Sequence, residues 1–447
     1  MFASLDIESF FPGYATWAER GSGVVTGATG WSRVFQARWA GNSTSVPTIG
    51  GGKQPMSTLT ILVCALLGIF ATTGCRPSET STGVPVSQGP AWRSGYLRPP
   101  VIDIHGHIYP DALPRLRKVM ADNGLVMVAN LSGGDLRAAP IWAQTVSEDA
   151  SRSGAAPLSM VQFFSLDWRR RNETDFGLAM AKELEVAVTA HGYKGLKIPK
   201  VLGLYAKDPS GKRIPVDWPE LDPIWAKAGE LDIPVAIHTA DPKAFWLPPT
   251  PDNERYEELA VHPGWSFHGP EWPDRLALLG ELERVFAKHP KTTFISLHFG
   301  NNAEEPDYVE RILNTYPNVY VDTAARLGEI GRHPPERMRA LFVKHADRIV
   351  FGTDLGLSAE GIMLGSTGTE EPTEADIKPF YDAHWRFFEG HERKIPHPTP
   401  IQGRWTIDAI GLPDDVLEKI YWRNAARLLK LTDNQLQQLE NGGLRRP

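Results

Sequence analysis

The sequence predicts an α/β protein, a (β/α)8 barrel of the TIM type, over residues 100–433. Two observations lead to this fold class. From Val101 onward, eight short apolar segments alternate with amphipathic stretches, a pattern that favours a parallel sheet covered by helices. Polar residues also follow the same end of several of these segments. An open doubly wound sheet is the alternative, but eight is the number of strands that closes a barrel.

The elements follow one another regularly along the chain. The predicted strands are 101–105, 125–131, 158–166, 194–198, 234–238, 292–298, 318–322 and 348–352. Amphipathic helices are predicted over 176–192, 270–290 and 306–317, and a last helix within 412–431, beginning near Pro413. Two connections exceed ordinary loop length, namely 239–273 and 356–404. Long loops at the C-terminal ends of barrel strands usually build the pocket, so we expect substrate to bind between them.

The composition excludes some classes of protein. A hydrophobic content of 42% is enough to bury a core. The net charge of -6 and the absence of a Lys/Arg run argue against a nucleic-acid partner. The only cysteines, Cys64 and Cys75, fall in one short apolar segment. Any metal site in the rest of the chain must therefore use histidine and carboxylate ligands.

The N-terminal part resembles an export signal. Residues 56–75 resemble the signal peptide of bacterial lipoproteins, with an apolar run too short for a confident membrane span and a lipobox-like end at Cys75. The resemblance implies lipidation of Cys75, hence an exported, periplasm-facing lipoprotein that meets the membrane only through its lipid. Residues 1–55 are then an over-extended start or a disordered extension, 76–99 a flexible tether and 434–447 a tail. A short membrane anchor is the alternative for the apolar segment.

The stretch "VIDIHGHIYP" (101–110) places His105 and His107 on one face of a strand, because side chains at i and i+2 point the same way. Taken alone, the pair is also compatible with two satisfied polar groups at a strand end. However, His238 ends the fifth strand, His298 the sixth, and Asp354 follows the eighth. Imidazoles and a carboxylate gathered at one rim of the barrel suit one divalent metal, best Zn²⁺, with Mn²⁺ or Fe²⁺ as alternatives.

The chain is similar to the amidohydrolase superfamily, and within it to the amidohydrolase-related branch of metal-dependent hydrolases and decarboxylases. The similarity covers nearly all of 101–431 and is carried by "DIHGH", "GLKI", "AIHTADP", "SLHFGNN", "VYVDTAAR" and "FGTDLG". It implies that the metal ligands are His105, His107, His238 and Asp354. It also implies that His298 contacts a second metal or orients the attacking water and the substrate.

The chemistry of these groups indicates their catalytic roles. A bound divalent ion lowers the pKa of its water from about 15.7 to about 7 and polarises a carbonyl oxygen. Asp354, beside that water, can accept its proton and pass it to the leaving group. His298 is expected to stabilise the oxyanion or to share the role of base. The alternative for Asp354 is a simple strand-end cap.

Other residues are candidates for contact with substrate. Lys197, near the end of the fourth strand, is expected to touch substrate or a carboxylate, with a carbamylated lysine bridging two metals and a solvated lysine as alternatives. Arg326, after the seventh strand, is placed to bind a substrate carboxylate in a bidentate manner or to pair with a structural acid. Asp103 shares the face of His105 by i, i+2 spacing, and is expected either to orient that histidine or to stabilise the fold as a buried acid.

Aromatic residues gather at strand ends and in the first long loop. Trp168 is expected to line an apolar pocket for substrate, together with Trp246, Trp265 and Trp272, and lid packing is the alternative. Histidines 262 and 268 in the same loop are interpreted as surface or lid residues.

Three functions are compatible with this sequence. The first is a metal-dependent hydrolase that cleaves a C–N or C–O bond of a small molecule, in an amide, lactone or ester. The second is a non-oxidative decarboxylase of a small aromatic or unsaturated acid, which uses nearly the same ligands. The third is a surface-anchored binding protein without catalysis. The sequence indicates neither the substrate nor the oligomeric state.

Overall fold

The computed structural model describes residues 98–443. The predicted extension, the signal peptide with Cys75, and residues 76–97 of the predicted tether lie outside the described residues. Within the described part of the chain, no helix combines the length and the hydropathy needed to cross a bilayer.

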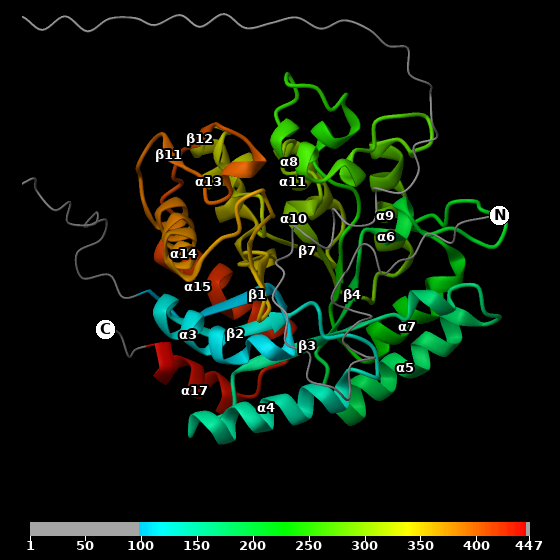
Figure 1. Cartoon of the computed structure of the whole chain (residues 1–447), viewed down its shortest axis with the longest axis horizontal. Helices are drawn as coiled ribbons and strands as arrows, with labels where there is room; N and C mark the ends of the chain where they lie inside the picture. The colour runs from blue at the N-terminus through cyan, green and yellow to red at the C-terminus, as the bar shows by residue number, and fades with distance from the viewer. Residues whose placement is uncertain (1–97, 444–447) are drawn as a thin grey trace, which may run out of the picture.

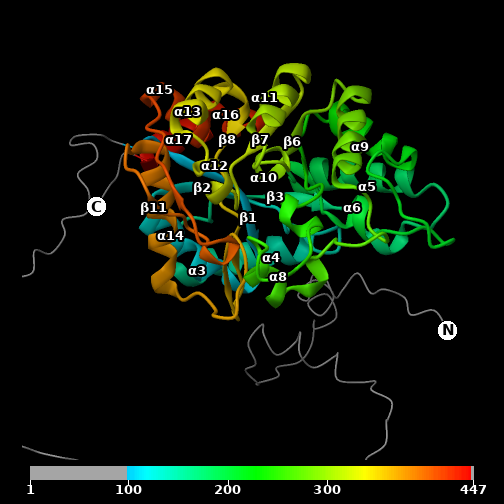
Figure 2. The same cartoon turned by 90° about the horizontal axis from the view of Figure 1, so that it is seen from above.

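Eight strands form the wall of a barrel, and each pairs in parallel with the next in chain order. They are β1 (Val101–Ile108), β2 (Leu125–Asn130), β3 (Met160–Ser165), β4 (Gly195–Ile198), β5 (Val235–Ile237), β6 (Phe294–Ser296), β7 (Val319–Asp322) and β8 (Ile349–Val350). Every one lies within or overlaps a predicted strand. The predicted α/β barrel is therefore confirmed, and helices surround the strands in both views (Figures 1 and 2).

The barrel closes between its last and first strands. Ile104 N donates to Phe351 O at 3.0 Å, and Asp354 N donates to His105 O at 2.9 Å. The chain then continues as β9 (Leu355–Leu357), which pairs in parallel with the end of β1, and β10 (Ile362–Leu364) pairs antiparallel with β9. The eighth strand is thus interrupted near Asp354, where a carboxylate enters the barrel mouth.

Strand β1 contains a bulge. Asp103 pairs with Val128 on β2, and Gly106 pairs with Asn130. Between these two pairs β1 advances by one residue more than β2, so β1 carries one extra residue there. The extra residue reverses which side chains face the interior. Asp103 consequently points outward, and the prediction that it shares the face of His105 is wrong, because i, i+2 spacing holds only in a regular strand.

Helices cover the outside of the barrel. The longer ones are α3 (Leu113–Asn123), α4 (Ala139–Ser153), α5 (Phe176–His191), α7 (Asp222–Glu230), α9 (Arg275–Lys288), α11 (Pro306–Thr315), α13 (Pro335–Lys344) and α14 (Glu374–Glu389). Predicted helices 176–192, 270–290 and 306–317 correspond to α5, α9 and α11. Helix α9 begins later than predicted because Pro273 precedes its N-cap, Asp274, whose side chain accepts from Ala277 N at 2.9 Å.

Short helical turns complete the connections. They are η2 (Pro110–Ala112), η3 (Trp168–Arg170), α6 (Val201–Leu204), η4 (Pro219–Leu221), η5 (Lys243–Trp246), α8 (Tyr256–Val261), η6 (Pro263–Trp265), α10 (Leu297–Gly300), α12 (Leu327–Gly331), η7 (Ala346–Arg348) and η8 (Pro400–Gln402). A small antiparallel pair, β11 (Ile395–Pro396) and β12 (Thr406–Ile407), lies in the last long connection. Both predicted long loops therefore contain local structure of their own.

The C-terminal segment plugs the barrel. The predicted helix within 412–431 consists of α15 (Asp414–Glu418), the π-helical η9 (Lys419–Arg423) and α16 (Asn424–Leu428). Trp422 belongs to one apolar cluster with inward-facing strand residues such as Ile102 and Ile295. Part of the predicted tail forms α17 (Asp433–Gly443), because Leu436 packs against the same cluster. Helix α17 contacts β2.

Candidate metal centre

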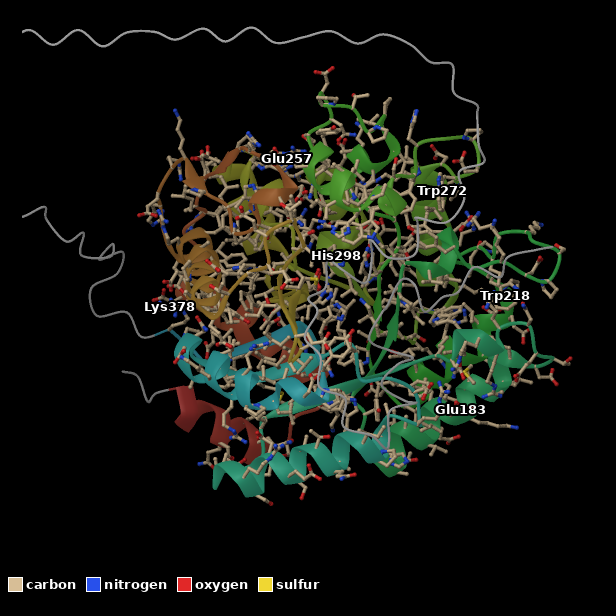
Figure 3. The ribbon with its side chains drawn as sticks, in the orientation of Figure 1. Glu183, Trp218, Glu257, Trp272, His298 and Lys378 are labelled. Atoms are coloured by element: carbon tan, nitrogen blue, oxygen red, sulfur yellow. The ribbon has the colours of Figure 1, made fainter. Side chains whose placement is uncertain are left out.

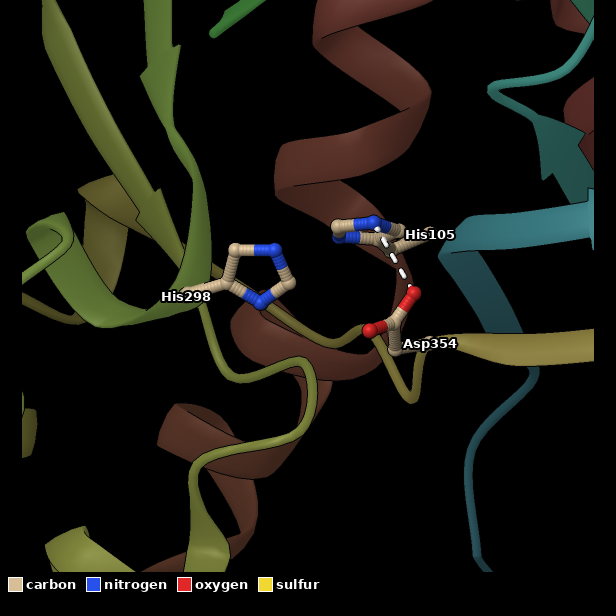
Figure 4. Close-up of side chains that lie close together, drawn as sticks. All are labelled: His105, His298 and Asp354. Carbon is tan, nitrogen blue, oxygen red and sulfur yellow. Dashed lines mark ion pairs between the residues drawn. The ribbon is translucent and has the colours of Figure 1, made fainter. Parts of the chain in front are cut away.

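Three potential ligands converge at the mouth of the barrel (Figure 4). Donor atoms of His105, His298 and Asp354 all lie within 4.8 Å of one another, and the three side chains are buried. They come from β1, from α10 directly after β6, and from the turn that interrupts the eighth strand. His105 Nε2 lies 3.3 Å from Asp354 Oδ1. In Figure 3, His298 lies at the centre of the molecule, away from the labelled charged residues at its periphery.

The other two predicted ligands lie next to this group. His107 Nε2 is 3.2 Å from Asp354 Oδ1, and its Nδ1 is 2.8 Å from Ser132 Oγ. The ring of His238 lies 4.3 Å from that of His298, but its Nε2 faces Asp241 Oδ1 at 3.3 Å. The structure thus gathers all five predicted residues, while its tightest triad contains His298 rather than His107 or His238. The ligand roles of His107 and His238 stay predictions.

Several residues at this rim have left-handed backbone conformations. His298 has φ 54° and Asp354 φ 65°, and Ala240 and Ala325 after β5 and β7 have φ 64° and 55°. Such conformations cost about 1–3 kcal/mol each for residues other than glycine, and they persist only where surrounding contacts enforce them. The chain therefore accepts strain at His298 and Asp354 themselves and just after the polar ends of β5 and β7.

One important residue of the site, Asp322, was missed by the sequence analysis. Its Oδ2 lies 2.6 Å from His105 Nδ1, and its Oδ1 accepts from His298 N at 2.6 Å. This contact assigns the ring proton of His105 to Nδ1, which leaves the lone pair of Nε2 available to a metal. Asp322 ends β7 as the other polar residues end their strands, so its place in "VYVDTAAR" was the available signal.

The structure fits a metal ion at this position. His105 Nε2 is buried and makes no hydrogen bond among the described residues, since with the ring proton on Nδ1 its lone pair faces Asp354 Oδ1 at 3.3 Å. A buried nitrogen without a partner is costly unless another group, such as a cation, satisfies its lone pair. A donor set of imidazoles and a carboxylate matches the preference of Zn²⁺ and related divalent ions.

The electrostatics of the site favour the metal-binding forms of its residues. Burial lowers the pKa of His107, lowers that of His238 to about 4, and lowers that of His298 well below its ordinary value. These imidazoles are neutral at pH 7, the form that binds metal. Burial opposes ionisation of Asp354, but His105 and His107 outweigh it and hold the pKa of this carboxyl below its usual range.

Two basic residues flank the metal candidates. Lys197 is buried on β4, and burial lowers its pKa to about 8 against the opposing charges of Asp354 and Asp322. Arg326 is also buried, and its Nη1 donates to Ala325 O at 2.8 Å. Among the residues that the structure describes, no carboxylate forms an ion pair with Arg326, although its charge, with that of Arg275, lowers the pKa of Glu304 at longer range.

The predicted pocket aromatics pack mainly on one another. The ring centroids of Trp168 and Phe176 lie 6.1 Å apart, and both residues belong to the main apolar cluster. Contact of Trp168 with substrate stays a prediction. In the loop after β5, Phe267 packs between two tryptophans. Its ring centroid lies 4.7 Å from that of Trp246 and 4.9 Å from that of Trp272. The remaining tryptophan of this loop, Trp265, stacks on His262 and on Phe245. These contacts support lid packing for the loop tryptophans.

A buried charge network joins the two long loops. Arg255 is fully buried; its Nη1 donates to Glu258 Oε2 at 2.7 Å and its Nη2 to Glu329 Oε1. Ser366 Oγ, in the loop after β10, donates to Glu258 Oε1 at 2.5 Å. Close by, His262 Nε2 lies 2.9 Å from Thr367 O. The loops after β5 and β10 therefore meet over the barrel and are tied to α12, which begins next to Arg326.

Comparison with known proteins places the chain in a family. The amidohydrolase family model matches residues 102–431. The chain belongs to this amidohydrolase family. Members of the family are metal-dependent, in agreement with the donor set described above. No curated protein is significantly similar to the chain.

Several solved structures are similar to this amidohydrolase at low sequence identity. The 2,6-dihydroxybenzoate decarboxylase from Rhizobium is 19% identical, with 74% of this chain and 99% of that one covered and a TM-score of 0.42. The 4-oxalomesaconate hydratase from Rhodopseudomonas palustris is 15% identical, with coverages of 75% and 98% and a TM-score of 0.40. The dihydroorotase from Campylobacter jejuni is 12% identical, with coverages of 75% and 84% and a TM-score of 0.42.

Proposed function

We propose that this amidohydrolase is a metal-dependent hydrolase that cleaves a C–N or C–O bond, in an amide, lactone or ester, of a small molecule. The observation that carries the proposal is the buried triad of His105, His298 and Asp354, in which His105 Nε2 has no hydrogen-bond partner among the described residues. One divalent ion would be held there, with Zn²⁺ preferred over Mn²⁺ and Fe²⁺. When bound, such an ion acidifies water and polarises a carbonyl group.

The residues of the chain supply the proton transfers. Asp354 is ionised at neutral pH, so its carboxylate accepts a proton from the attacking water and returns it to the leaving nitrogen or oxygen. His298 Nδ1 lies 3.0 Å from Ala324 O, which assigns its ring proton to that nitrogen. Its other ring nitrogen then carries a lone pair. This favours a role as ligand or base over a role as oxyanion donor.

The substrate class follows from Arg326. A buried guanidinium without a carboxylate partner among the described residues is stabilised when an anion pairs with it. We therefore propose that the substrate carries a carboxylate, bound by Arg326 and oriented toward the metal candidates. Lys197, whose charge interacts with those of Asp354 and Asp322, is the second cation that would contact the substrate.

A non-oxidative decarboxylase is the second candidate, and Arg326 is also the observation that favours it. If the carboxylate bound by Arg326 is the group that leaves as CO2, the reaction is a decarboxylation. Substrates separate the two functions. Lactones, amides and esters that carry a carboxylate would be hydrolysed with release of acid, whereas aromatic or unsaturated acids would release CO2.

The first test combines metal analysis with substrate screening. We expect the full chain to hold about one divalent ion, the Asp354→Asn variant to hold less and to lose activity, and the Asp347→Asn variant to behave as wild type. Asp347 is a matched control because its side chain is exposed and pairs with Lys419. A wild-type chain that stays metal-free after reconstitution would overturn the catalytic proposal and leave a non-catalytic binding protein. Metal binding with CO2 release alone would favour the decarboxylase.

We also propose that the protein is exported and anchored through lipidated Cys75. The sequence pattern of residues 56–75 supports this. In a bacterial host, the wild-type chain is expected in the membrane fraction, and a Cys75→Ser variant is expected to lose the lipid-dependent mass increase. An unmodified wild-type Cys75 would contradict the anchor.

A further inference from the structure

We infer that Asp103 is a positioning residue that holds the backbone of two metal ligands, His105 and Asp354, in the arrangement that binds the ion. The inference rests on the proposed metal site and adds a determinant of its affinity. Asp103 lies on the outer side of β1 and is fully buried. It therefore acts through the main chain and does not face the reacting groups.

The carboxylate of Asp103 accepts four hydrogen bonds. Its Oδ1 accepts from His105 N at 3.1 Å and from Thr353 N at 3.1 Å. Its Oδ2 accepts from Thr353 Oγ1 at 2.5 Å and from Tyr381 OH at 3.0 Å. An ionised carboxylate offers about four acceptor positions, so all are used here. One side chain thus connects β1, the interrupted eighth strand and α14.

The first of these bonds stabilises the bulge in β1. A bulge leaves main-chain groups without a partner in the ladder. Asp103 Oδ1 supplies the partner for His105 N, directly inside the irregular step between Asp103 and Gly106. Since the extra residue is what turns His105 toward the interior, loss of this acceptor would favour a regular strand that faces His105 away.

The bonds to Thr353 restrain the other ligand. Asp354 has φ 65°, a conformation that local preferences oppose. Thr353, immediately before it, is held at both its N–H and its hydroxyl by Asp103. The same hydroxyl accepts from Leu355 N at 3.2 Å. The residues on both sides of Asp354 are therefore tied to Asp103, which maintains the strained turn.

Removal of partners that orient metal ligands typically weakens metal binding about 10–100-fold, and we expect a loss of this size for Asp103→Asn. An amide at this position has one acceptor oxygen and a donating NH2 group, so it cannot accept all four bonds. Tyr381→Phe removes the bond from α14 to Asp103 and the interaction of the same hydroxyl with Thr353, but it leaves the bonds from His105 N and Thr353 to Asp103. It is expected to lower stability without weakening metal binding comparably.

A control for general loss of stability is available. Glu281 is another buried acid, which accepts from Val216 N and from Arg213, outside the metal site. Zn²⁺ dissociation constants would be measured by chelator competition for the wild type, Asp103→Asn, Tyr381→Phe and Glu281→Gln. The absorption spectrum of the Co²⁺-loaded proteins would report ligand geometry directly, and thermal unfolding of the metal-free proteins would report stability.

We expect weaker Zn²⁺ binding and an altered Co²⁺ spectrum for Asp103→Asn alone. Wild-type affinity in a folded Asp103→Asn variant, or an equal loss in Glu281→Gln, would overturn the inference. If Asp103→Asn does not fold, Thr353→Val removes the hydroxyl bond at similar volume, and unchanged affinity in that variant would overturn it as well. A wild-type chain that binds no Zn²⁺ would instead contradict the proposed metal site itself.

Discussion

Replacement of Arg255 by methionine should destabilise the fold strongly, although no catalytic role is assigned to this residue. Its guanidinium is fully buried between the carboxylates of Glu258 and Glu329. Methionine fills a similar volume but leaves two buried acids without a counter-charge. Breaking a buried ion pair by removal of one partner costs about 3–5 kcal/mol. A carboxylate left without its counter-charge can instead take up a proton. For an ordinary glutamate at pH 7 this costs about 3–4 kcal/mol, so the loss of stability from each carboxylate cannot exceed that value.

The assay is urea unfolding at pH 7 and pH 5, with Arg311→Met as the matched control. Arg311 also makes two bonds to one glutamate, Glu283, at 2.7 and 2.8 Å, but its side chain is half exposed. Such an exposed pair contributes about 0–1 kcal/mol. The deficit of Arg255→Met should shrink at pH 5, because protonation of the stranded carboxylates becomes easier. Two results would refute the reasoning. One is a loss of unfolding free energy in Arg255→Met no larger than in Arg311→Met, and the other is a large loss that is the same at pH 7 and pH 5.

Two further predictions concern stability. Burial lowers the pKa of His384 to about 4, whereas its unfolded value is 6.5. The unfolded chain therefore binds a proton more readily than the folded chain, and the free energy of unfolding falls by up to about 3 kcal/mol as the pH drops from 6.5 toward 4. The urea midpoint should decline less over this range in His384→Gln, and an equal decline would contradict the assignment. A Cβ at Gly177 would lie 1.7 Å from Glu220 O, so Gly177→Ala should lower the unfolding temperature, with a cost of about 1–3 kcal/mol or more. At Gly264 an added Cβ meets nothing within 4 Å, and Gly264→Ala serves as the control.

The strand-helix alternation was readable from the sequence because each strand of a parallel barrel is buried on both faces and appears as a short apolar run. The ends of those runs also identified the residues that meet at the rim. The face of Asp103 was not readable, since a bulge is set by pairing with β2 and by contacts with Thr353 and Tyr381. Asp322 was passed over because one carboxylate at a strand end is compatible with many roles until its neighbours are known.

The charge network of the long loops was also beyond the reach of local patterns. Arg255 and Glu258 are near neighbours in the chain, but Glu329 and Ser366 come from different connections. Only the closed barrel brings these connections together. Their buried charges are stable because each carboxylate finds a donor, a condition of tertiary structure that composition and periodicity do not report.

The position of the barrel's closing seam has a consequence for folding. His105 and Asp354 lie on the two sides of the seam and near opposite ends of the barrel sequence, joined by the bond from Asp354 N to His105 O. Contacts of such large sequence separation form late and slowly. An ion bound by both residues would act as a cross-link across the last gap to close. Metal uptake would thus report completed folding, and the amide protons of Ile104 and Asp354 would exchange more slowly once the ion is in place.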